Sequence, residues 1–158
     1  MARAKRHSHD KGRKGVLPVL IVESRYYPEI ADDLARGAGA VLAAAGVPFE
    51  RLVVPGVFEI PAAIRLIARS RRGRGIGGYI ALGCVIRGET DHYDHICREA
   101  SRALMTLALE DGLAVGFGIL TCPTAAHARV RAAPDKKNKG AEAARACLAM
   151  MALKSSLR

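Results

Sequence analysis

Two patterns of apolar residues alternate along the chain. Segments rich in apolar residues predict strands at residues 16–23, 49–54, 79–86 and 115–121, and the unbroken apolar run at residues 79–86 is typical of a strand buried on both faces of a parallel sheet. Stripes that repeat every three or four positions predict helices at residues 28–45, 58–71, 92–111, 125–132 and 139–153. Because strands alternate with helices and the links between them are short, the pattern predicts an α/β fold in which helices cover both faces of a parallel sheet.

Length and composition favour one domain. Of the 158 residues 50% are hydrophobic but only 4% are aromatic, so the core must be largely aliphatic, as is usual for helices on a parallel sheet. We expect a single domain at residues 15–158, preceded by a disordered basic arm at residues 1–14. The apolar block at residues 16–22 is interrupted by Pro18 and lacks a small-residue cleavage site, so it is interpreted as a strand and not as a signal peptide. No apolar run approaches the roughly 20 residues of a membrane-spanning helix.

The net charge of +10 raises the question of a nucleic-acid partner. Residues 1–14 carry six basic residues and one acidic residue, hence +5 of that charge, and a second cluster comprises Arg69, Arg71, Arg72 and Arg74. These clusters are either a solvated arm and loop or a footprint for a phosphate backbone. Because no aromatic residue interleaves them, base stacking is unsupported, and we favour the solvated interpretation, without nucleic acid as a partner.

The four cysteines, Cys84, Cys97, Cys122 and Cys147, are spaced too widely for a metal knuckle or a redox pair. Cys84 falls in a predicted buried strand, and Cys97 and Cys147 fall in predicted helices. A free thiol in such places packs as a small hydrophobic side chain. We therefore expect reduced cysteines and a cytoplasmic location.

The predicted strand at residues 79–86 ends in Arg87-Gly88 and leads into a helix that begins at His92. We expect Thr90 and Asp91 to cap that helix with their side-chain oxygens. Backbone N–H groups at this strand-to-helix turn, together with the positive end of the helix dipole, are suited to bind a phosphate or another anion. His92, in the first helical turn, is a candidate to accept and return protons.

Two other kinds of site were weighed. His92 and His95 lie three residues apart beside Asp91 and Asp94, a spacing that could suggest a metal, but no partner motif for further ligands stands out. A dinucleotide fingerprint is missing after the first predicted strand, because residues 23–27 contain no glycine. Each polar residue at the predicted strand ends could also be merely structural, and it is their combination that favours a site.

Four segments of the chain resemble the lumazine synthase family: residues 54–61 (VPGVFEIP), 82–94 (LGCVIRGETDHYD), 117–121 (FGILT) and 138–140 (NKG). The resemblance extends in order from about residue 19 to residue 150. It implies a flavodoxin-like three-layer αβα sandwich with a four-stranded parallel sheet. It also implies the condensation of 5-amino-6-ribitylamino-2,4(1H,3H)-pyrimidinedione with 3,4-dihydroxy-2-butanone 4-phosphate to 6,7-dimethyl-8-ribityllumazine, with release of phosphate. No metal and no organic cofactor are implied.

The resemblance also implies roles for individual residues. Tyr26 is similar to the aromatic residue that stacks on the pyrimidine ring, and Val85 and Ile86 would line the ring pocket. The ribityl chain would be held by Val57, Phe58 and Glu59. The phosphate loop would comprise Gly88, Glu89 and Thr90, and we expect the carboxylate of Glu89 to point away from the phosphate.

The resemblance implies catalytic roles for two residues. His92 would transfer protons, and Arg131 resembles the arginine that closes the phosphate site across a subunit interface. Lys139 would add a second positive charge, and Arg129 remains an alternative assignment for the arginine. Phe117 is similar to a hydrophobic wall supplied by the neighbouring subunit. A shared site implies that the chain assembles with itself, and the family forms pentamers, some of which build sixty-subunit shells.

Residues 132–137 replace the glycine-containing turn that is frequent in the family's shell-formers. Because Pro134 stiffens this turn and Lys136 and Lys137 would repel their counterparts, we expect assembly to stop at a homopentamer. Two other functions stay open on the sequence: a non-catalytic flavin- or lumazine-binding protein on the same fold, and a nucleic-acid binder that uses the basic arm.

Overall fold

The computed structural model describes residues 15–158, so the arm expected at residues 1–14 lies outside the described residues. Four parallel strands form one sheet: β1 (Val19–Ser24), β2 (Phe49–Val54), β3 (Gly78–Ile86) and β4 (Val115–Cys122). Their order in the sheet is β2-β1-β3-β4. Because all four strands run in the same direction, their carboxyl ends lie at one edge, where such sheets bind ligands.

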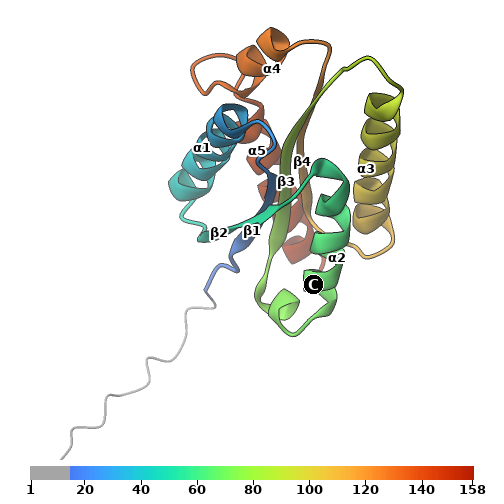
Figure 1. Ribbon diagram of the computed structural model, residues 1–158. Helices are drawn as coiled ribbons and strands as arrows, with labels where there is room; N and C mark the ends of the chain where they lie inside the picture. The colour runs from blue at the N-terminus through green and yellow to red at the C-terminus, as the bar shows by residue number, and fades with distance from the viewer. Residues whose placement is uncertain (1–14) are drawn as a thin grey trace, which may run out of the picture.

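Helices cover both faces of the sheet (Figure 1). One face carries α1 (Pro28–Ala44), α4 (Ala125–Ala132) and α5 (Lys139–Ser156), and the other carries α2 (Ile60–Arg69) and α3 (His92–Leu109). This arrangement confirms the predicted three-layer α/β sandwich with a four-stranded parallel sheet.

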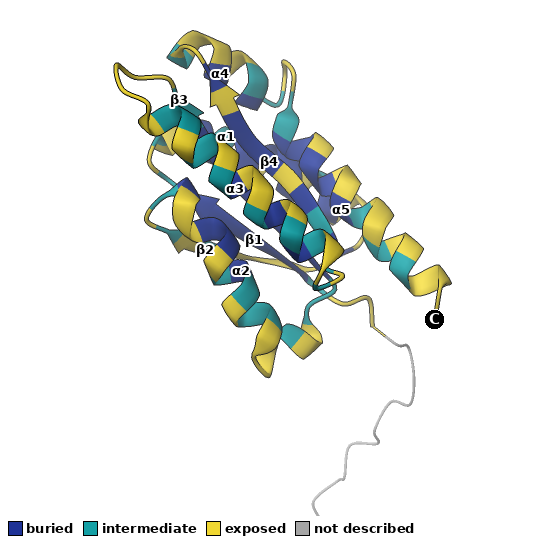
Figure 2. Ribbon diagram, turned by 90° about the vertical axis from the view of Figure 1, so that its right-hand side faces the viewer, coloured by how far each residue is buried: buried dark blue, intermediate teal, exposed yellow. Residues whose placement is uncertain are grey.

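Two apolar clusters, one on each face of the sheet, hold the layers together. In β1, Val19 and Ile21 point towards α1, α4 and α5, whereas Leu20 and Val22 point towards α2 and α3. All of them are buried, as the period of two in a strand covered on both faces requires. Figure 2 shows the resulting pattern: the central strands β1 and β3 are mostly buried, whereas the edge strand β2 and the outer faces of the helices are largely exposed.

The ends of several elements differ from the prediction. β1 begins at Val19 and not at residue 16, because Pro18 has no N–H to donate to a neighbouring strand and Val16 and Leu17 are exposed. The predicted helix at residues 58–71 is a short 3₁₀ turn, Val57–Glu59, followed by α2 from Ile60 to Arg69. Within residues 15–158, no helix is both long enough and apolar enough to span a membrane.

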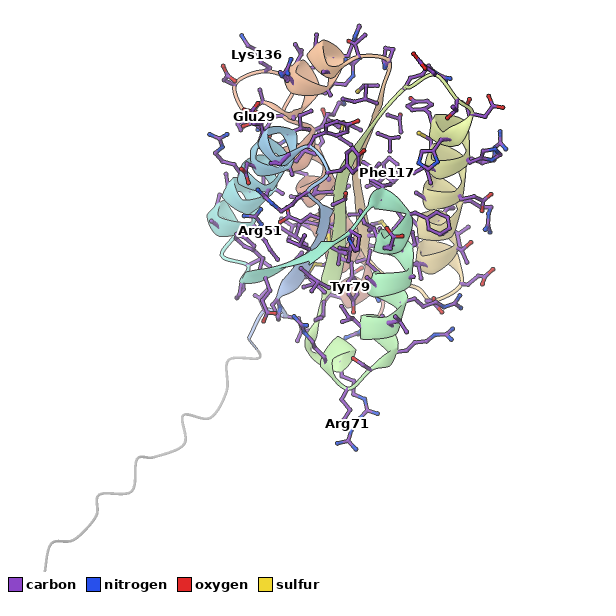
Figure 3. The ribbon with its side chains drawn as sticks, in the orientation of Figure 1. Glu29, Arg51, Arg71, Tyr79, Phe117 and Lys136 are labelled. Atoms are coloured by element: carbon purple, nitrogen blue, oxygen red, sulfur yellow. The ribbon has the colours of Figure 1, made fainter. Side chains whose placement is uncertain are left out.

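The second basic cluster belongs partly to a 3₁₀ turn, Arg72–Gly75, and partly to the end of α2. Arg69 forms an ion pair with Asp111 at 3.2 Å, and Arg72 forms one with Glu50 at 2.5 Å. Arg71 points away from the body of the protein (Figure 3). The cluster is thus a surface feature whose charge is partly neutralised by acidic neighbours.

The start of α5 explains the NKG segment of the sequence. Asn138 adopts a left-handed conformation with φ of 47°, and its side chain accepts a hydrogen bond from the Ala141 N–H at 3.4 Å. Gly140 is buried against α1, where a Cβ atom would collide with the Leu34 carbonyl oxygen. These two residues therefore allow α5 to begin in close contact with α1.

Candidate active site

A cavity of about 440 Å³ opens at the carboxyl edge of the sheet, between the β1–α1 turn, the 3₁₀ turn before α2 and the first turns of α3. Its size lies within the usual range for small-molecule sites. It is lined by Ser24, Tyr26, Tyr27, Pro55, Gly56, Val57, Phe58, Glu59, Cys84, Val85, Ile86, Gly88, Thr90, His92, Tyr93 and Ile96. The structure thus brings residues from three separate segments of the sequence, 24–27, 55–59 and 84–96, into one pocket.

One wall of the pocket is the turn between β1 and α1. The ring of Tyr26 is 73% exposed, and it meets the ring of Tyr27 edge to face, with centroids 5.0 Å apart and an interplanar angle of 72°. Tyr27 in turn packs against the buried cluster under α1, and burial raises the pKa of its hydroxyl group above the ordinary value of 10.0. Tyr27 therefore supports Tyr26, which keeps a ring face open for a flat ligand.

The opposite wall is the 3₁₀ turn Val57–Glu59. Val57 is buried, whereas Phe58 is 59% exposed at the mouth of the pocket. Gly56 leaves room for the carboxylate of Glu59, since a Cβ atom at Gly56 would lie only 2.9 Å from Glu59 Oε2. The turn therefore offers one apolar surface and one hydrogen-bond acceptor for hydroxyl groups.

The loop between β3 and α3 forms the third side, with Gly88, Thr90 and His92 lining the pocket. Thr90 Oγ1 accepts a hydrogen bond from the His92 N–H at 3.4 Å, whereas the side chain of Asp91 makes no capping hydrogen bond. The prediction that both residues cap the helix is therefore wrong for Asp91, whose backbone is already helical at φ −71° and ψ −1°. The N-terminal end of α3 faces the pocket with its partial positive charge.

Four residues named from the sequence do not line this pocket. Glu89 is exposed on the loop beside it. Phe117 in β4 is 47% exposed and pairs with Ala81 in β3. Ala81 lies four residues, or about 13 Å, before the pocket residue Val85 along β3, so Phe117 is a similar distance from the pocket. Arg131 donates to the His127 carbonyl oxygen at 3.2 Å, and Lys139 pairs with Glu142 at 2.7 Å. Both cations lie on the face of the sheet that carries α1, α4 and α5.

The sequence also left several lining residues unassigned. Cys84 belongs to the predicted buried strand at residues 79–86, and Tyr93 and Ile96 belong to the predicted helix at residues 92–111, so their residue types give no sign of a site. Their position at the carboxyl ends of the strands and in the first turns of α3 could have indicated it. Burial raises the pKa of Cys84 to about 12, so its thiol is protonated and unreactive at neutral pH.

The pocket holds one imidazole and one carboxylate among mainly apolar and aromatic groups, and none of its lining residues within residues 15–158 is a lysine or an arginine. The same range contains no group of three or more His, Cys, Asp or Glu side chains that could hold a metal ion. The pocket can therefore take a flat ring and hydroxyl groups, whereas a phosphate bound at the start of α3 would find backbone N–H groups and Thr90 but, among the described residues that line the pocket, no cationic side chain.

Comparison with known proteins gives a consistent result. The model of the family described as 6,7-dimethyl-8-ribityllumazine synthase matches residues 16–155. A protein of that name from Paramagnetospirillum magneticum is 47% identical over 143 residues, which cover 88% of this chain and 95% of that protein. A protein of the same name from Nitrobacter winogradskyi is 48% identical over a match that covers 88% of this chain and 86% of that protein. Another, from Bartonella bacilliformis, is also 48% identical, and the match covers 86% of this chain and 89% of that protein.

Proposed function

The chain belongs to the 6,7-dimethyl-8-ribityllumazine synthase family, and we propose that the pocket described above is its active site. It catalyses the condensation of 5-amino-6-ribitylamino-2,4(1H,3H)-pyrimidinedione with 3,4-dihydroxy-2-butanone 4-phosphate, a step of riboflavin biosynthesis. The observation that carries the proposal is the convergence of Tyr26, Glu59 and His92 from separate segments on one cavity. The family match supplies the two substrates that this cavity has to hold.

The pyrimidine substrate binds between Tyr26 and the apolar floor of the pocket. The exposed ring of Tyr26 stacks on the pyrimidinedione, and Val85 and Ile86 contact its other side. The ribityl chain extends along Val57 and Phe58, and its hydroxyl groups donate hydrogen bonds to the Glu59 carboxylate.

The phosphate of the second substrate binds at the start of α3. The N–H groups of the loop at residues 88–90 and the Thr90 hydroxyl group donate to its oxygens, and the helix dipole favours its negative charge. The amine of the pyrimidine then lies close to the ketone of the butanone. Holding the two substrates in this register supplies a large part of the acceleration.

His92 transfers the protons of the reaction. The amine attacks the ketone and water leaves to give an imine, a carbon proton is removed, and phosphate is eliminated to leave an enol. The enol tautomerises to a ketone, and the second amine attacks this carbonyl and closes the ring with loss of a second water. Each step moves a proton near the start of α3, where His92 lines the pocket and is exposed to solvent for exchange. The departing phosphate requires a cationic partner for its developing charge.

Arg131 and Lys139 of a neighbouring subunit supply that partner, and the neighbour's Phe117 covers the mouth of the pocket. Three observations support a shared site. The pocket-lining residues within residues 15–158 include no lysine or arginine, Arg131 and Lys139 lie outside the pocket of their own subunit, and Phe117 is exposed about 13 Å along β4 from it. A planar guanidinium group can bind two phosphate oxygens at once.

A shared site requires a closed ring, and the proposed assembly is a homopentamer in the cytoplasm. Each subunit of such a ring presents two different surfaces, one with the pocket and one with Arg131 and Phe117. The turn between α4 and α5, with Pro134 and the exposed Lys136, argues against further assembly into a shell (Figure 3). All four cysteines are free, in keeping with a reducing compartment.

The test is an activity assay with both substrates, followed by the absorbance and fluorescence of the lumazine and by phosphate release. Wild-type protein should form product without added metal. Arg131→Ala should lower kcat/KM about a hundredfold or more, as expected for loss of a charged group at a developing anion. Arg129→Ala tests the alternative assignment, since Arg129 is an exposed arginine two residues away on the same helix. It should leave kcat/KM unchanged, and a loss as large as that in Arg131→Ala would favour Arg129 as the phosphate ligand. Binding of the lumazine without turnover would instead favour a carrier protein.

Light scattering or sedimentation at moderate salt tests the assembly. A pentamer of 16.8 kDa chains is expected at about 84 kDa. A particle near a megadalton would contradict the predicted stop at the pentamer, and a stable, active monomer would contradict the shared site.

A further inference from the structure

One ion pair closes the loop that contains the proposed phosphate site. Arg87 directly follows β3, and its Nη1 and Nη2 atoms donate to the two carboxylate oxygens of Asp94, at 3.3 and 3.0 Å. The guanidinium carbon of Arg87 also lies 4.3 Å from the ring centroid of Tyr93. Arg87 thus contacts two successive residues in the first turn of α3, on the far side of the loop at residues 88–91.

The backbone of Arg87 is fixed as well. Its N–H donates to the Cys122 carbonyl oxygen at 3.0 Å and so ties the start of the loop to the last residue of β4. Tyr93 lines the pocket next to His92. With both ends held, the loop has little freedom to change the direction of its N–H groups or of the His92 side chain.

The pair has a second, electrostatic effect. The proposed phosphate site lies near several carboxylates, including Glu89, Asp91 and Asp94, each of which would repel a phosphate. Asp94 is the one whose charge is neutralised by a bidentate arginine. The guanidinium group of Arg87 is in turn occupied by Asp94 and by the ring of Tyr93, and Arg87 does not line the pocket.

We propose that Arg87 is a positioning residue, which acts through Asp94 and Tyr93 to hold residues 88–90 and His92 in the geometry that binds the phosphate of the butanone substrate. The inference rests on the proposed phosphate role of residues 88–90. It does not depend on a large contribution to stability, because Arg87 and Asp94 are 49% and 44% exposed and exposed ion pairs stabilise proteins only weakly.

The alternative is that Arg87 binds phosphate directly once substrate arrives. The two roles differ in what Asp94→Asn does. If Arg87 positions the loop, Asp94→Asn and Arg87→Gln break the same contact and should both weaken phosphate binding. Arg87→Gln should weaken it more, because it also leaves the charge of Asp94 unpaired, and the double variant should be no worse than Arg87→Gln. If Arg87 is a phosphate ligand, Asp94→Asn frees it and should leave phosphate binding unchanged or make it tighter.

The experiment measures, on the assembled protein, the Kd of inorganic phosphate and the KM of each substrate. Arg87→Gln should raise the Kd of phosphate and the KM of the butanone phosphate about tenfold, because a displaced loop loses oriented donors, and Asp94→Asn should raise both values by a smaller factor. The KM of the pyrimidine should change less than about twofold, since its proposed contacts lie elsewhere in the pocket. Arg87→Lys should restore binding only in part, because an ammonium group cannot form the bidentate contact.

Arg102→Gln is the matched control. Arg102 pairs with Glu99 at 2.7 Å on the same helix, is also exposed, and lies outside the pocket. It should leave both KM values unchanged. Equal effects of Arg87→Gln on both KM values, or phosphate binding that is normal or tighter in Asp94→Asn, would overturn the inference.

Thr90→Ala separates this inference from the proposed phosphate site itself. If Thr90→Ala weakens phosphate binding but Arg87→Gln does not, the loop binds phosphate and the positioning role is wrong. If neither variant changes the Kd of phosphate, the proposed site at residues 88–90 is wrong and the inference about Arg87 is overturned with it.

Discussion

Removal of Arg51 should destabilise the fold strongly. Glu23 lies in β1 with only 1% of its side chain exposed, and its Oε1 atom accepts hydrogen bonds from Arg51 Nε at 3.0 Å and Arg51 Nη2 at 2.8 Å. Arg51 belongs to the edge strand β2 and is labelled in Figure 3. In Arg51→Met the carboxylate of Glu23 would remain buried beside an apolar side chain.

The cost follows from the burial of the two partners. Removal of one member of a buried ion pair destabilises a protein by about 3–5 kcal/mol, because the remaining charge is left without a partner. Since the Arg51 side chain is 40% exposed, water can reach part of the vacated space, and we expect a loss near the lower limit, about 3 kcal/mol. For a domain of this size that corresponds to a fall in Tm of about 6–12 °C.

The assay is denaturant or thermal unfolding of wild type and variants at one protein concentration, since assembly makes the midpoint depend on concentration. Arg72→Gln is the control, because Arg72 forms an exposed pair with Glu50, the residue next to Arg51 in β2, and it should cost less than about 1 kcal/mol. Adding Glu23→Gln to Arg51→Met should recover a large part of the loss. A loss in Arg51→Met no larger than in Arg72→Gln, or no recovery in the double variant, would refute the reasoning.

Three further outcomes are expected. His92→Ala should slow turnover about a hundredfold with the fold intact, because substrate alignment persists without the imidazole; complete loss of product in the fluorescence assay would contradict this. Burial raises the pKa of Cys84 and Cys147 from 9.0 to about 12, so the folded chain keeps protons that the unfolded chain loses. The free energy of unfolding should therefore be unaffected by these thiols below pH 9 and fall as pH rises towards 12, less steeply in Cys147→Ala. Gly140→Ala should destabilise the fold by about 1–3 kcal/mol in denaturant unfolding, because its Cβ atom would collide with the Leu34 carbonyl oxygen.

The parts of the site that the sequence predicted are those fixed by chain direction. Residues that follow parallel strands meet at one edge, so the order of the elements predicts that Tyr26, Phe58 and Gly88 lie close together, and all three line the pocket. The layers of the fold were predictable because the unbroken apolar run at residues 79–86 suits a strand covered on both faces, and a helical stripe suits a helix with one buried face.

Side-chain contacts between distant segments were not predictable in this way. The sequence does not indicate that Arg51 pairs with Glu23, 28 residues earlier, because that contact depends on the register of β1 and β2. Nor does it indicate that Asp91 is already helical and gives no cap, since the choice between Thr90 and Asp91 depends on backbone angles. Such details require the folded chain.

The central claim, that one active site combines the pocket of one subunit with Arg131 of its neighbour, can be tested most directly by mixing two variants that each have little activity alone. Tyr26→Asp alters the exposed ring in the pocket, and Arg131→Ala removes the cation. Rings assembled from equal amounts of both chains contain some sites with an intact pocket and an intact neighbour. About a quarter of wild-type activity is expected, since each half of a site is intact in about half of the subunits. Activity that stays at the level of the separate variants, in rings shown to contain both chains, would contradict the account.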